Sequence, residues 1–75
     1  MELQKFVECF ANQFDDTDPE EFTASTEFHN LDEWSSLTGM AVIALAKTEY
    51  GKTITGKELR ECVTIEDVYN LIASK

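Results

Sequence analysis

The sequence predicts a small all-α protein: a four-helix bundle with three main helices, one short helix and a long first loop. Two segments, residues 3–14 and 65–72, repeat apolar residues at helical spacing. Between them lies an apolar run of helical length, and no segment alternates as a half-buried strand does. Seventy-five residues are enough for one domain, residues 1–75, near the lower limit for independent folding.

The first helix is expected over residues 2–14. Six apolar residues fall on one face of it, and the three phenylalanines among them would supply much of the core. Burying each ring contributes roughly 1.5–3 kcal/mol. The stripe consists of Leu3, Phe6, Val7, Phe10, Ala11 and Phe14.

Residues 15–34 form a long connection. Asp18 before Pro19 predicts a short helical turn, because aspartate caps a helix start and proline suits its first position. Four apolar residues then recur in a polar segment and are expected to anchor the loop to the core. They are Phe22, Phe28, Leu31 and Trp34.

The central helix is expected within residues 34–51, where no side chain from Trp34 to Ala46 is charged. Ser35 or Ser36 can cap its start, and Gly51 stands where a C-terminal glycine belongs. A helix that is apolar nearly all round is either buried or keeps an apolar face for a partner. We expect Val42, Leu45 and Tyr50 in the core, with Ile43 left open, and a contact face made of Leu37, Met40, Ala41 and Ala44.

Residues 57–62 are expected to form the short helix, with Leu59 pointing inward. Thr64 and Asp67 resemble a capping box and predict the start of the last helix. Its inward stripe is Ile65, Val68, Leu71 and Ile72.

The formal net charge of −9 argues against nucleic acid and against anionic membrane surfaces. The negative charge favours solubility, and it would also favour binding to partners that present basic patches. The sequence holds no apolar run of membrane-spanning length and no signal peptide, so we expect a cytoplasmic monomer. Cys9 and Cys62 lack metal-ligand spacing and are expected to be reduced thiols.

No catalytic constellation is evident, and the single histidine, His29, is expected in a surface loop. Asp16, Asp18, Glu20 and Glu27 fit the ligand spacing of a calcium-binding EF-hand loop. Glu21 occupies the position that needs glycine, so we expect no specific metal site. Because no catalytic constellation is evident, we expect no enzyme activity. A calcium-responsive acidic protein remains one alternative function.

The hydroxyl of a serine at a helix N-terminus can have either of two roles. Its hydroxyl can serve as a plain N-cap, or it can carry a phosphodiester where the helix dipole and free N–H groups favour phosphate. Ser35 and Ser36 both satisfy this condition from sequence.

The chain resembles acyl carrier proteins over essentially its whole length. Phe22-Thr23, Phe28, Leu31 and Ser35-Ser36-Leu37 follow the order and spacing of the region around the family's modified serine. Further matches are Glu49-Tyr50-Gly51 at the end of the second helix, Ile54 in the connector, and Thr64-Ile65-Glu66-Asp67 at the last helix. The acidic composition and the length agree as well.

The resemblance implies that Ser36, directly before Leu37, carries a 4′-phosphopantetheine derived from coenzyme A. The chain would then be a phosphoprotein that holds acyl, aminoacyl or peptidyl groups as thioesters, for fatty acid, polyketide or related biosynthesis. Its partners would be a phosphopantetheinyl transferase and the acyltransferase, ketosynthase or ligase enzymes of the pathway. Leu37, Met40 and Ala41 would contact them.

The sequence departs from the family pattern in two places. Ser35 replaces the aspartate before the modified serine, and the second helix is nearly uncharged. Recognition by basic patches would therefore use Asp32, Glu33 or Glu58, or give way to apolar docking. The second alternative is an unmodified acidic helical interaction module with a carrier-like fold.

Overall fold

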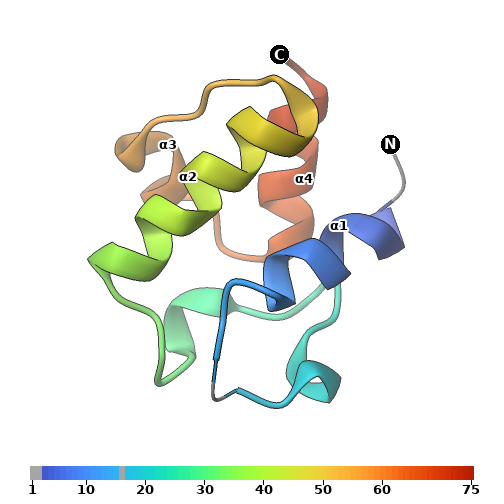
Figure 1. Cartoon of the computed structure of the whole chain (residues 1–75), viewed down its shortest axis with the longest axis vertical. Helices are drawn as coiled ribbons and strands as arrows, with labels where there is room; N and C mark the ends of the chain where they lie inside the picture. The colour runs from blue at the N-terminus through green and yellow to red at the C-terminus, as the bar shows by residue number, and fades with distance from the viewer. Residues whose placement is uncertain (1–2, 16) are drawn as a thin grey trace.

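The computed structural model describes residues 3–15 and 17–75, and these form four α-helices and two short 3₁₀ helices without a strand (Figure 1). This confirms the all-α bundle of three main helices and one short helix. The expected helical position Glu2 lies outside the described residues. The elements are α1 (Leu3–Ala11), η1 (Pro19–Glu21), η2 (Phe28–Asn30), α2 (Ser36–Tyr50), α3 (Gly56–Glu61) and α4 (Ile65–Ala73).

The core lies where α1, α2 and α4 meet. Figure 1 shows α2 crossing the molecule, with α3 on one side of it and α1 and α4 on the other. Phe6 and Phe10 of α1 are fully buried, with ring centroids 6.1 Å apart. Val42 of α2 and Ile72 of α4 are also fully buried. The apolar periodicity therefore predicts the inward faces of α1 and α4 correctly. The expected extent of the first helix is corrected: α1 ends at Ala11, and the buried Phe14 lies beyond the helix.

The helix ends follow the predicted capping chemistry. Gly51 adopts a positive φ of 65°, and its N–H donates to the carbonyl of Lys47 at 3.1 Å. Thr64 and Asp67 form the expected capping box: each accepts a hydrogen bond from the other's backbone N–H, at 3.2 and 3.0 Å. The Asp67 carboxylate accepts the backbone N–H groups of both Thr64 and Val63, and these two hydrogen bonds lower its pKa.

The long first loop is attached to the core at the four predicted anchors. Phe22 and Phe28 are buried, and Leu31 and Trp34 pack half-buried against the core. The loop also receives the first N–H groups of α4, since Ile65 donates to the carbonyl of Thr26 at 3.1 Å. These contacts hold the described part of the long connection against the core.

The burial of α2 agrees with the sequence prediction at most positions. Val42 and Leu45 are buried, whereas Tyr50 is only half-buried, with its ring 5.8 Å from that of Phe6. The prediction of Tyr50 as a core residue is therefore corrected: it lies at the boundary, because the last turn of α2 extends to the edge of the bundle. Ala46, not predicted, is fully buried.

None of the described helices combines the length and the apolar composition needed to cross a bilayer.

Candidate functional site

The two serines at the start of α2 have different roles. Ser35 is the N-cap: it has extended backbone, and its hydroxyl accepts the N–H of Thr38 at 3.4 Å. Ser36 is the first helical residue, is exposed, and its hydroxyl receives or donates no hydrogen bond among the described residues. Ser36 is thus the serine whose hydroxyl is available for chemistry, while that of Ser35 stabilises the helix start.

An open groove lies beside Ser36, between α2 and α3. Its volume is about 370 Å³. Its apolar floor includes Gly39 and Met40 of α2 and Leu59 of α3, and Arg60 stands at its rim. The full lining is His29, Trp34, Ser35, Ser36, Gly39, Met40, Ile43, Gly56, Leu59 and Arg60.

Gly39 keeps the floor of this groove free. It is buried, and a Cβ added there would lie 3.6 Å from both Leu59 Cδ2 and Trp34 Cζ2. These are ordinary contact distances, so a methyl group would fit but would occupy space that the glycine leaves open. The floor therefore depends on a residue without a side chain.

The predicted contact face of α2 is largely exposed. Leu37 is 77% exposed and Met40 is 64% exposed, so two large apolar side chains of this face are open to solvent. Ala44 is exposed on the same face, whereas Ala41 is half-buried at its margin. The structure therefore brings Ser36, Leu37 and Met40 together on one accessible surface and leaves Ala41 at the edge.

A second hollow continues along α2 from this groove. It shares Met40 and Ile43 with the first and extends to Ala44, Lys47 and Thr53. The lining residues of the two hollows include cations, Arg60 and Lys47, and no carboxylate. The charge on this side of α2 is therefore opposite in sign to that of the protein as a whole, in which 15 acidic residues outnumber 6 basic ones.

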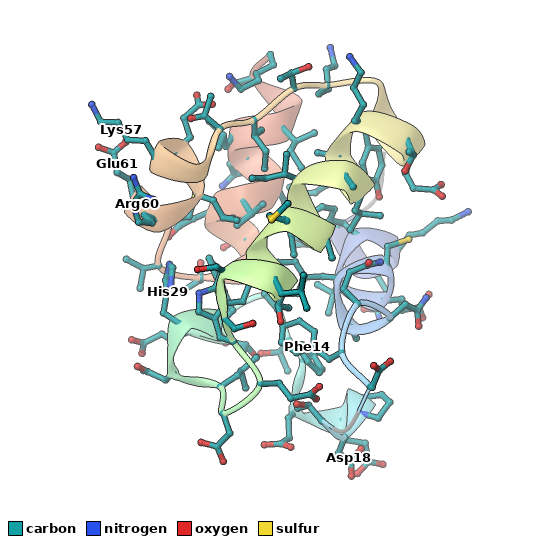
Figure 2. The ribbon with its side chains drawn as sticks, turned by 60° about the vertical axis from the view of Figure 1, so that its left-hand side comes forward. Phe14, Asp18, His29, Lys57, Arg60 and Glu61 are labelled. Atoms are coloured by element: carbon teal, nitrogen blue, oxygen red, sulfur yellow. The ribbon has the colours of Figure 1, made fainter. Side chains whose placement is uncertain are left out.

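The charges are unevenly distributed along the chain. Ten acidic residues lie within residues 2–33, whereas five of the six basic residues lie within residues 47–75. Figure 2 shows Lys57, Arg60 and Glu61 projecting from α3, with His29 below them. The acidic first loop and the mixed-charge α3 therefore border α2 on different sides.

The remaining candidate residues have structural roles. His29 is exposed, and its Nε2 lies 3.0 Å from the carbonyl oxygen of Cys62, which connects η2 to the end of α3. Cys9 and Cys62 are free thiols, as predicted. Burial, with Asp67 nearby, raises the pKa of the Cys62 thiol, so it stays protonated at neutral pH.

Within residues 3–15 and 17–75, no group of three or more histidine, cysteine, aspartate or glutamate side chains is arranged to hold a metal ion. Asp16, the first residue of the considered calcium loop, lies outside the described residues. Asp18 instead caps η1, where its carboxylate accepts the N–H of Glu20 at 2.9 Å.

The sequence prediction missed the α3 side of the groove. Leu59 was expected inward, but neither Arg60 nor Gly39 was identified as part of the site. Arg60 follows the inward Leu59 on a short helix, so its position beside α2 could have been suggested only by knowing how α3 packs. No protein-family model, curated protein or solved structure matches this chain.

Proposed function

We propose that this protein is a freestanding carrier that holds acyl, aminoacyl or peptidyl groups on a 4′-phosphopantetheine attached to Ser36. The proposal rests on one observation above all: Ser36 presents an exposed hydroxyl with no partner among the described residues, at the first turn of α2 and beside an apolar groove. The order of matching residues along the chain supports the same assignment.

The surroundings of Ser36 fit such a prosthetic group. The hydroxyl is accessible to a transferase, and Gly39 leaves space on the groove floor that a Cβ would fill. When bound, the group would supply a terminal thiol that carries cargo as a thioester. The residues of the chain would supply attachment at Ser36 and an apolar surface at Leu37 and Met40 for the enzymes that load and use the cargo.

The nearly uncharged face of α2 favours apolar docking. In the first two turns of α2, Leu37 and Met40 are exposed and no residue is charged. Partners of this carrier would be a phosphopantetheinyl transferase and the acyltransferase, ketosynthase or ligase of a biosynthetic pathway. We place the protein in the cytoplasm as part of the same proposal.

Intact-mass measurement after incubation with coenzyme A and a broad-specificity phosphopantetheinyl transferase tests the proposal. Wild-type protein and Ser35→Ala are expected to gain one phosphopantetheine, while Ser36→Ala gains none. Loss of the gain in Ser35→Ala alone would move the attachment site by one residue. No gain with several transferases would refute the carrier function and favour the unmodified interaction module, whose docking surface would be Leu37 and Met40.

A further inference from the structure

One cation, Arg60, lies at the rim of the groove. Arg60 makes no ion pair with any described residue, although Glu61 follows it in sequence. It is the only residue with a formal charge among those lining the groove beside Ser36. Its Nη1 atom lies 3.7 Å from the position of a Cβ on Gly56, so the guanidinium folds back along α3 over that glycine.

Arg60 brings a positive charge to the groove that Ser36 lines, in a chain whose net charge is −9. A guanidinium group binds phosphate through paired, charge-assisted hydrogen bonds. The apolar floor of Gly39, Met40 and Leu59 begins beside it. The groove thus combines one cation with an apolar surface and lacks any carboxylate that would repel an anion.

The part of a phosphopantetheine closest to its serine has the complementary chemistry. It is an anionic phosphodiester followed by a carbon that bears two methyl groups. Tethering at Ser36 brings these groups to the groove that Ser36 itself lines. Charge complementarity and the tether therefore point to one occupant.

We propose that Arg60 and the groove floor hold the proximal part of the arm against the α2–α3 surface, with Arg60 as a positioning residue for the phosphate. This inference rests on the proposed function. It assigns to α3, which the sequence did not implicate, the role of controlling where the arm lies. Gly39 contributes by leaving the floor open for the methyl-bearing segment.

The single tryptophan provides a direct probe, because Trp34 lines the same groove. The experiment compares unmodified and fully loaded protein by Trp34 emission and by the ³¹P resonance of the arm, with loading verified by intact mass. The variants are Arg60→Gln, Arg60→Lys and the matched control Lys57→Gln. Lys57 is exposed on the same helix but does not line the groove.

Loading of the wild type and Lys57→Gln is expected to shift both signals. In Arg60→Gln the shifts should fall to less than about half of the wild-type values, with Arg60→Lys intermediate because lysine lacks the paired donors. Gly39→Ala should reduce the Trp34 shift without any change of charge.

Complete loading with equal shifts in wild type and Arg60→Gln would overturn the inference and leave the carrier function standing. An equal reduction in Lys57→Gln would also overturn it, because the effect would then be one of general charge. Absence of any mass gain would refute the carrier function and the inference together.

Discussion

Replacing Gly39 by alanine should make the unmodified protein more stable. Glycine in a helix interior costs about 0.8–1 kcal/mol relative to alanine, since its unfolded backbone is freer. The added Cβ would meet Leu59 and Trp34 at 3.6 Å, which is normal van der Waals contact, so no strain offsets the gain. We therefore expect a free energy of unfolding higher by about 1 kcal/mol.

For a domain of this size the change corresponds to a rise in Tm of roughly 4–8 °C. Thermal unfolding followed by circular dichroism measures it. Gly51→Ala, at the C-cap of the same helix, is the matched control: nothing lies within 4 Å of an added Cβ there, but φ is +65°. That variant should lose about 1–2 kcal/mol from backbone strain alone. A lower Tm for Gly39→Ala would refute the packing described around Trp34.

The other expectations concern the cap, the core and pH. Ser35→Ala should lower the free energy of unfolding, measured in urea, by about 0.5 kcal/mol. This is at the low end for an N-cap because the hydrogen bond is long at 3.4 Å. Ser36→Ala should be nearly neutral, and the reverse order would contradict the capping assignment. Phe10 is fully buried, so Phe10→Ala should lower the free energy of unfolding by about 3–5 kcal/mol and leave little folded protein by circular dichroism. Leu37 is exposed, so Leu37→Ala should change that free energy by less than about 0.5 kcal/mol. Asp67 has a lowered pKa in the fold, so its contribution is present above its unfolded pKa and is lost as pH falls through the folded pKa. Urea midpoints measured from about pH 7 to about pH 3 should fall less steeply in Asp67→Asn, and identical slopes would contradict this role.

The helices and most of the core are predictable from the sequence because their signals are local. The apolar stripe of α1 identifies Phe6 and Phe10, and the pair Thr64 and Asp67 marks the start of α4. These features depend on residues within one or two turns of each other. Tyr50 was misplaced because its burial depends on where the end of α2 meets α1, which periodicity does not determine.

The candidate site is predictable only in part. Sequence placed Ser35 and Ser36 at a helix start but could not say which one caps it, since that depends on backbone geometry at the first turn. The groove depends on the packing of α3 against α2, which places Arg60 and Ser36 in the lining of one groove although they are 24 positions apart in the chain. A short helix with one inward leucine carries too little pattern to specify that contact.

The most direct test of the central claim is the intact mass of the protein purified from the cells that make it. The carrier account predicts a population heavier than the unmodified chain by one phosphopantetheine, or by that group with its cargo, and peptide mapping should place the added mass on Ser36. A single population at the mass of the unmodified chain, alongside a known carrier that is modified in the same cells, would contradict the account.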